Sequence, residues 1–263
     1  MLTYRDTMKD WTWSFSRVNL YDTCPYAAYK RYIEEAPGID NFYSQAGSLM
    51  HKCLEEIARQ QMTVQDALDW FIEVFDDTCD MPIPEKIRDN TFDKMVAFLA
   101  DLDDHALDGY EVLGVEKEIF FNINGIRFKG YIDLLLRDQN GDIIIVDHKS
   151  SGYPLGKNGQ VLKSKEKEFL GHRRQLCLYA RAVMSEYNRW PKALVWNHFK
   201  DEKVCTIPFD WVEAAEAVGW AEEVIERMMS DEEFAASKNY FYCYNLCGYR
   251  DGTCEYLFDD AEE

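Results

Sequence analysis

One continuous stretch decides the fold of this chain: residues 130–149, which read GYIDLLLRDQNGDIIIVDHK. It joins the end of one predicted strand, 126–136, to a second, 143–148, and the Asn140-Gly141 pair between them is a turn signal. The unbroken apolar run at 143–146 favours a buried central strand over an exposed one. The stretch therefore predicts a hairpin near the centre of a β-sheet.

Two acidic residues make the register of this hairpin informative. Side chains alternate between the faces of a strand, so Asp147 and Lys149 share one face. A two-residue turn would pair residue 133 with 148 and place Asp133 on the other face. A three-residue loop, 139–141 with Gly141 left-handed, pairs 133 with 147 instead. We expect that loop, or a bulge that shifts the register by one; the alternative is an ordinary hairpin with Asp133 facing solvent.

Helical patterns flank the hairpin on both sides. The expected helices are two short ones within 17–33, divided at Cys24-Pro25, and longer ones at about 44–61, 64–75, 86–107, 171–187 and 211–229. The expected strands are 112–121, 126–136, 143–148, 193–199 and 203–208. Helices before, between and after a sheet indicate an α/β or α+β sandwich.

Length and composition are those of a globular protein. The chain has 263 residues, 47% of them hydrophobic, without repeats or low-complexity segments, so we expect one domain. The N-terminus lacks the apolar run of a signal peptide, no segment approaches the length of a membrane span, and a cytoplasmic location is expected. The eight cysteines would then be thiols or metal ligands rather than disulfides. The expected domain, 1–263, comprises a mainly helical part at 1–108, the sheet at 109–210 and a C-terminal helix with a Cys-rich segment at 211–263.

Four short motifs carry the candidate chemistry: Gly47-x-x-x-His51, Gly130-x-x-Asp133, Asp147-His148-Lys149 and Gln175-x-x-x-Tyr179. Together they supply oxygen and imidazole ligands for a divalent cation and a lysine to lie beside a phosphate. Residues four apart share one face of a helix, which groups the members of the first and fourth motifs. Phosphodiester hydrolysis requires an activated water and neutralisation of the charge that develops on oxygen. The set therefore predicts a metal-dependent nuclease.

Each motif residue also has a purely structural interpretation. His51 could be a hydrogen-bonded histidine of an ordinary helix, and Lys149 could be a surface lysine at a strand end. Gln175 and Tyr179 could form a helix face whose tyrosine packs in the core. The joint order of the four motifs favours the functional interpretation.

Charge is distributed unevenly along the chain. The net charge of −19 opposes general binding to nucleic acid, because affinity for the phosphate backbone rests largely on Lys and Arg. Residues 149–174, however, contain seven basic side chains and two acidic ones, and they lie between the third and fourth motifs. This basic strip would draw a strand toward one groove; the alternative is a solvated loop or helix face.

Cysteines form a second constellation near the C-terminus. Cys243, Cys247 and Cys254 fall within twelve residues of a segment with little apolar periodicity, and Cys24 is a plausible fourth ligand. A metal bound by these thiolates would substitute for core packing, whereas free cysteines would simply be small buried apolar residues.

The motifs resemble those of the PD-(D/E)XK nuclease superfamily, and within it the RecB-like exonuclease branch, which includes the CRISPR adaptation exonucleases and AddAB-type nuclease domains. The resemblance extends over most of the chain, from Ser14-x-Ser16 and Tyr21-x-x-Cys24-Pro25 to the C-terminal cysteines. It implies an α/β fold with a restriction-endonuclease-like core: a central mixed β-sheet flanked by helices, with a helical N-terminal region and a Cys-rich C-terminal segment.

The resemblance also implies roles for individual residues. Lys149 would lie next to the attacking water and the scissile phosphate, while Gln175 and Tyr179 match the motif that supports the site and contacts DNA. The implied ligands of Mg²⁺ or Mn²⁺ are His51, Asp133, Asp147 and the backbone carbonyl of His148.

In the same branch, one N-terminal and three C-terminal cysteines hold a [4Fe–4S] cluster that ties the chain ends together. The corresponding residues are Cys24, Cys243, Cys247 and Cys254. Their spacing departs from the usual two and five intervening residues, with three and six here, which leaves zinc or no metal as alternatives.

The resulting expectation is a DNA exonuclease of a phage or of a bacterial recombination or repair system. It would act on linear or single-stranded ends in the cytoplasm of a bacterial or phage-infected cell, without a membrane, and a helicase or recombinase could be its partner. The alternatives are a non-catalytic DNA-binding or assembly subunit with the same fold, and a site-specific endonuclease. The oligomeric state stays open.

Overall fold

The computed structural model describes residues 4–257, and these divide into two compact units. The sheet unit comprises Phe42–Phe121 and Gly130–Ala217. The terminal unit comprises the described parts of Met1–Asn41, Asn122–Lys129 and Val218–Glu263. Each unit is described by itself below. Whether the chain folds as the single expected domain stays a prediction.

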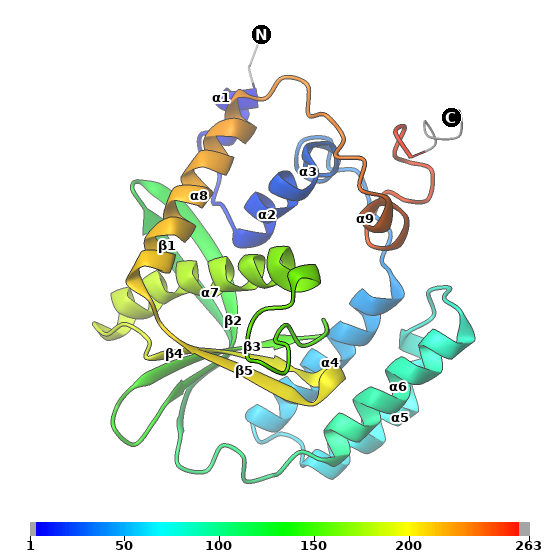
Figure 1. Cartoon of the computed structure of the whole chain (residues 1–263), viewed down its shortest axis with the longest axis vertical. Coiled ribbons are helices and arrows are strands. Elements are labelled where there is room, and N and C mark those ends of the chain that lie inside the picture. The colour runs from blue at the N-terminus through cyan, green and yellow to red at the C-terminus, as the bar shows by residue number, and fades with distance from the viewer. Residues whose placement is uncertain (1–3, 258–263) are drawn as a thin grey trace. The chain divides into compact units, whose positions relative to one another are not determined.

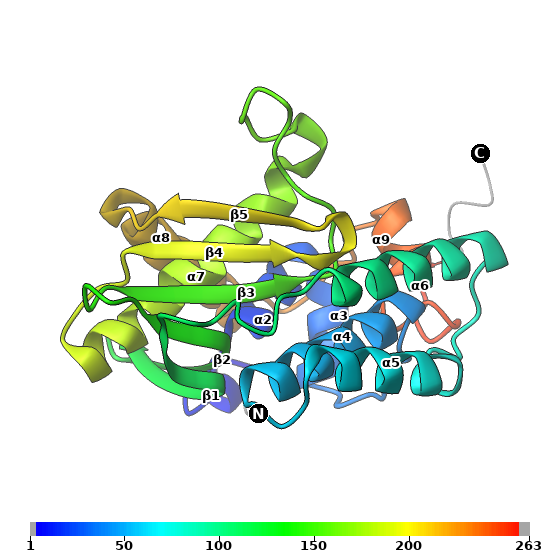
Figure 2. The same ribbon diagram turned by 90° about the horizontal axis from the view of Figure 1, so that it is seen from below.

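A five-stranded mixed sheet forms the centre of the sheet unit, with strand order β1-β2-β3-β4-β5 (Figure 2). β3 pairs parallel with β4, and the pairs β2–β3 and β4–β5 are antiparallel. The expected α/β class, a central mixed sheet flanked by helices, is confirmed. The strands are β1 (Glu111–Ile123), β2 (Ile126–Arg137), β3 (Ile143–Lys149), β4 (Ala193–His198) and β5 (Lys203–Pro208).

The β2–β3 hairpin has the predicted three-residue loop. Leu134 pairs with Val146, which brings residue 133 opposite 147 in the continued register. The backbone N–H of Asp138 donates to the carbonyl of Asp142 at 2.9 Å, leaving 139–141 as the loop. Gly141 has a φ of +80°, the left-handed conformation that glycine adopts without steric cost. The loop length therefore places Asp133 and Asp147 on one face of the sheet.

Helices pack around the sheet within the same unit (Figures 1 and 2). α7 lies on one face, while α4, α5 and α6 pack against one another near the C-terminal end of β3, around a core that includes Phe71 and Phe75. The predicted helix over 86–107 is too long, because α6 ends at Ala100. The bounds are α4 (Phe42–Ala58), α5 (Val64–Thr78), α6 (Glu85–Ala100) and α7 (Glu166–Tyr187), with short 3-10 turns at Lys163–Lys165 and Phe199–Asp201.

The terminal unit contains short helices from both ends of the chain. Ser14 caps α2 by accepting a hydrogen bond from the backbone N–H of Arg17. Pro25 opens α3, as the sequence predicts. Among the described residues, no helix combines the length and apolar character needed to cross a membrane. The helices are α1 (Tyr4–Met8), α2 (Phe15–Thr23), α3 (Pro25–Tyr32), α9 (Tyr240–Asn245) and α8 (Trp211–Ser230), whose first turns belong to the sheet unit.

Candidate active site and metal centre

The candidate site begins where β2 and β3 part. Asp133 Oδ2 accepts a hydrogen bond from the backbone N–H of His148 at 2.6 Å. This bond links β2 to β3 just beyond their last paired residues, Leu134 and Val146. Asp147, one residue earlier on β3, is only 3% exposed. The hairpin register thus fixes both carboxylates before any ligand is present.

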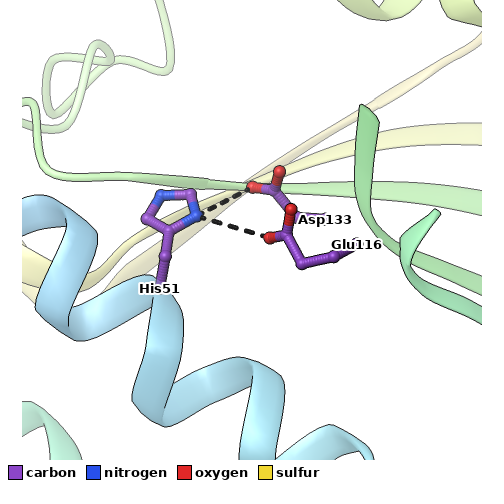
Figure 3. Close-up of side chains that lie close together, drawn as sticks. All are labelled: His51, Glu116 and Asp133. Carbon is purple, nitrogen blue, oxygen red and sulfur yellow. Dashed lines mark ion pairs between the residues drawn. The ribbon is translucent and has the colours of Figure 1, made fainter. Parts of the chain in front are cut away.

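His51 reaches the same place from α4. Its Nδ1 lies 3.6 Å from Asp133 Oδ2 and 3.9 Å from Glu116 Oε1, and the imidazole faces both carboxylates (Figure 3). One ligand atom from each of these three residues falls within 4.8 Å of the others. Such a group of imidazole and carboxylates is the donor set of a divalent cation.

Glu116 is a candidate ligand that the sequence analysis does not predict. It lies inside β1 with a φ of +47°, a conformation that non-glycine residues rarely adopt in a strand. A Cβ at Gly114 would lie 2.8 Å from the Cβ of Lys117, so the strand is tightly folded over these residues. Like a β-bulge, this distortion interrupts the alternation of side chains between the two faces of the strand. No periodic signal in the sequence announces it.

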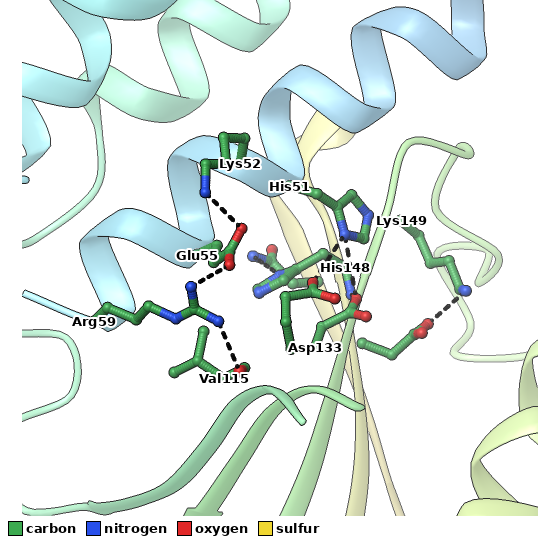
Figure 4. A network of polar contacts seen from close by, with 11 residues as sticks. His51, Lys52, Glu55, Arg59, Val115, Asp133, His148 and Lys149 are labelled. Carbon is green, nitrogen blue, oxygen red and sulfur yellow. Dashed lines mark hydrogen bonds and ion pairs between the residues drawn. The ribbon is translucent and has the colours of Figure 1, made fainter. Parts of the chain in front are cut away.

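A polar chain on α4 braces this part of β1 (Figure 4). Glu55 forms ion pairs with Lys52 and Arg59, and Arg59 donates to the backbone carbonyl of Val115 at 3.3 Å. Because Val115 precedes Glu116, the brace holds the distorted strand beside the helix that carries His51.

The surroundings of the site raise the pKa values of two of its groups, Asp133 and His51. Burial and the charge of Asp147 raise the pKa of Asp133 to about 7. Burial alone would lower the pKa of His51, but its contact with Glu116 and the charges of Asp133 and Asp147 raise it above the ordinary value. Without a cation, protons therefore occupy the site and relieve the repulsion between carboxylates.

Lys149 lies beside the carboxylates, where the motif predicts it. Its Nζ is 2.7 Å from Asp147 Oδ2, and it donates a hydrogen bond to Gln175 Oε1 at 3.1 Å. The contact with Asp147 is an ion pair without hydrogen-bond geometry, because Asp147 Oδ2 has no hydrogen-bond donor among the described residues. Strand β3 and helix α7 together fix the ammonium.

Tyr179 supports this arrangement from the interior. It is only 5% exposed, it contacts Gln175 and the backbone of Tyr131, and burial raises its pKa to about 12. A Cβ at Gly130 would lie 2.5 Å from Cε1 of Tyr179, so the glycine of the second motif makes room for the tyrosine of the fourth. Tyr179 is thus buried beside Gly130, and its implied role in supporting the site and contacting DNA stays a prediction.

His148 and Gly47 complete the motifs, and the ring of His148 lies edge-on to that of His51, with centroids 5.8 Å apart. Burial lowers the pKa of His148 to about 3, and its Nδ1 lies 3.3 Å from Nδ2 of Asn197. Because strand side chains alternate, its imidazole lies on the opposite face from Asp147. A Cβ at Gly47 would lie 3.4 Å from Ser150 Oγ, an ordinary contact, so α4 does not need glycine there for close approach.

A groove of about 620 Å³ opens onto the candidate site. His51 and Glu116 lie in its wall, as does Ser150, which follows Lys149. Its only lysine or arginine is Lys52. Among the described residues, none of the seven basic side chains of 149–174 lines this groove, so the predicted basic strip lies outside it.

The four predicted cysteines converge in the terminal unit. Cys24, Cys243, Cys247 and Cys254 line one small pocket, where Cys24 is the N-cap residue of α3 and Cys243 lies in α9. Burial raises the pKa of Cys247, and the three neighbouring thiols raise it further. In contrast, Cys53, Cys79, Cys177 and Cys205 are buried in the core.

Comparison with known proteins assigns the chain to a family. The model of the PD-(D/E)XK nuclease superfamily matches residues 12–256. No curated protein matches the chain. The fold is similar to that of a “Putative exonuclease” from Eubacterium rectale (TM-score 0.49, 11% identity, 86% of this chain and 82% of that one). It is also similar to that of SSO0001 (TM-score 0.39, 17% identity, 94% and 89%), and neither likeness adds to the assignment. The chain therefore belongs to the PD-(D/E)XK nuclease superfamily.

Proposed function

We propose that this chain is a metal-dependent deoxyribonuclease, and more narrowly a RecB-like exonuclease that hydrolyses phosphodiester bonds from DNA ends. One observation carries the proposal. His51, Glu116 and Asp133 gather within 4.8 Å of one another beside an open groove, with the Asp147–Lys149 ion pair next to them. Family membership supports nuclease chemistry, and the residue pattern of the RecB-like branch supports an exonuclease.

The donor set fits Mg²⁺ or Mn²⁺. Carboxylate oxygens suit both ions, and His51 adds one imidazole nitrogen to the set. His51, Glu116 and Asp133 would hold the ion. Asp147, whose Oδ2 lies 2.7 Å from the ammonium of Lys149, lies outside that group of three and remains a further candidate ligand. When bound, the ion supplies positive charge that acidifies water and stabilises the developing charge on phosphate oxygens. The carbonyl of His148 remains a further candidate ligand.

The chain's own residues hold and orient the reacting groups. Lys149 presents a compact ammonium whose position is fixed by Asp147 and Gln175. That ammonium serves either to orient the attacking water or to neutralise charge on the phosphate. Gln175 is held in turn by Tyr179, so the fourth motif acts on catalysis through Lys149.

End-labelled linear DNA, closed circular DNA and single strands, each incubated with Mg²⁺ or Mn²⁺, test the proposal. We expect progressive degradation of linear substrates, lost in Asp147→Ala and Lys149→Ala and retained in Lys86→Ala, which alters an exposed lysine of α6. Cutting of closed circles would instead indicate an endonuclease. Binding without cleavage in either metal would indicate a non-catalytic subunit.

We also propose that Cys24, Cys243, Cys247 and Cys254 hold a [4Fe–4S] cluster. The support is their convergence on one pocket of the terminal unit. Zinc therefore stays the alternative to the cluster, and the metal content of the purified protein decides between them. When bound, the cluster would tie both chain ends to one inorganic core.

Anaerobic purification tests the cluster. We expect a brown protein containing iron and sulfide, which Cys254→Ser loses and Cys53→Ser, altering a buried cysteine of the sheet unit, retains. Stoichiometric zinc, or a colourless protein without iron and sulfide, would overturn this proposal. The same RecB-like pattern suggests a cytoplasmic role in phage or bacterial recombination or repair, with a helicase or recombinase as partner.

A further inference from the structure

Two tyrosines border the groove that leads to the candidate metal ligands. Tyr43 lies on α4, and with Gly47 and His51 it follows the four-residue spacing of one helix face. Tyr131 lies on β2 two residues before Asp133, so both side chains project from the same side of that strand. The groove thus has an aromatic ring on each of two elements and the candidate ligands along the same walls.

Tyr131 is fixed at one end and partly exposed to solvent. Its hydroxyl donates a hydrogen bond to Glu118 Oε1 at 2.7 Å, which anchors the end of the ring. The residue is nevertheless 46% exposed. Tyr43 is half-buried and carries the ammonium of Lys200 5.5 Å from its ring centroid. An anchored ring with an exposed face loses little conformational freedom when a flat ligand stacks on it.

The lining of the groove offers little positive charge for the phosphates of a nucleic-acid strand. Lys52 is the only lysine or arginine in the lining, and it already pairs with Glu55 and Glu56. Glu55 and Glu116 add negative charge to the same walls. Phosphate contacts therefore contribute little beyond a bound cation, and affinity must come from another part of the nucleotide.

We propose that Tyr43 and Tyr131 are positioning residues that stack the bases of an unpaired DNA strand and so deliver one phosphate to the metal ligands. This inference rests on the proposed function. A base inside a duplex is already stacked on both sides, whereas an unpaired base presents a free face to a tyrosine ring. The groove would accordingly select single-stranded or frayed ends. Because stacking replaces phosphate contacts, binding should depend only weakly on salt.

Binding can be measured without cleavage in a Lys149→Ala background with Mn²⁺, because that substitution leaves the candidate ligands in place. The probe is a short oligodeoxynucleotide carrying 2-aminopurine, single-stranded or in a blunt duplex. We expect quenching of the single-stranded probe, and an increase in its Kd of about 5- to 150-fold on Tyr131→Leu or Tyr43→Leu, the usual contribution of one stacked base. Tyr131→Phe, which keeps the ring and loses only its anchor, should weaken binding less than Tyr131→Leu does. The matched control is Tyr110→Leu, which alters another exposed tyrosine of the sheet unit.

The outcomes separate this inference from the proposed function. Equal Kd values for the tyrosine-to-leucine variants and the Tyr110→Leu control would overturn the stacking role, even if the wild-type protein degrades DNA. Equal affinity for single strand and blunt duplex would overturn the selection of unpaired strands. Loss of binding confined to the Tyr43 and Tyr131 variants would support the inference, even in a protein that cleaves nothing. In the active protein, the same variants should raise KM and leave kcat nearly unchanged.

Discussion

Replacing Gly130 with alanine should destabilise this protein, because the added Cβ would collide with the ring of Tyr179, a residue distant in sequence. The added Cβ would lie 2.5 Å from Cε1, 2.7 Å from Cζ and 2.8 Å from the hydroxyl oxygen of that ring. The ring is buried and contacts Gln175, so it has no free space into which to retreat. Overpacking of this kind costs about 1–3 kcal/mol of unfolding free energy. The melting temperature should fall by about 2–4 °C for each kcal/mol lost.

Chemical denaturation of four proteins tests this reasoning: the wild type, Gly130→Ala, Tyr179→Leu and the double variant. Leucine removes the ring, so Gly130→Ala should cost less than about 0.5 kcal/mol in the Tyr179→Leu background. Gly47→Ala is the matched control, because its Cβ would make only an ordinary contact with Ser150. An unaltered stability of Gly130→Ala, or the same loss in both backgrounds, would refute the argument.

Three further predictions concern the candidate site. The pKa of Asp133 is raised to about 7, so this group stabilises the metal-free fold most below its unfolded pKa, about 4, and that contribution is lost as pH rises through 7. Mn²⁺ should therefore raise the melting temperature more at pH 8 than at pH 6, and equal shifts would contradict the assignment. Glu116→Gln should weaken Mn²⁺ binding in calorimetry at least about 10-fold, whereas Glu118→Gln, on the same strand, should not. Gln175→Leu removes the acceptor for Lys149 and should lower kcat about 10- to 100-fold with little change in Mn²⁺ affinity; a normal kcat would exclude the positioning role.

The hairpin and the position of Lys149 could be predicted because both depend on residues that are close together in the sequence. The alternation of strand side chains, together with a loop that needs one left-handed glycine, fixes the side on which Asp133 lies. Asp147 and Lys149 follow from being two apart on the same strand. The two short helices at Cys24-Pro25 are equally local, because proline is well suited to the first turn of a helix.

Glu116 and the end of α6 could not be predicted because backbone geometry overrides pattern there. The positive φ of Glu116 breaks the two-residue period, so its direction could not be deduced from its place in the strand. Beyond Ala100, Asp103 accepts a hydrogen bond from the backbone N–H of His105, and Asp104 accepts one from that of Val64. Aspartates that bond to the backbone in this way compete with helix formation, although the apolar pattern continues to 107.

The loop at 139–141 has a consequence for how this hairpin tolerates change. Residues 133 and 147 face the same way because the number of residues that separates them is odd, a matter of parity rather than of distance. Slipping the pairing by one residue would turn one carboxylate to the other face, and it would turn the buried apolar side chains of the same strand with it. Burial of those side chains therefore also preserves the alignment of the two carboxylates. An inserted residue would cost less as a longer loop than as a slipped strand.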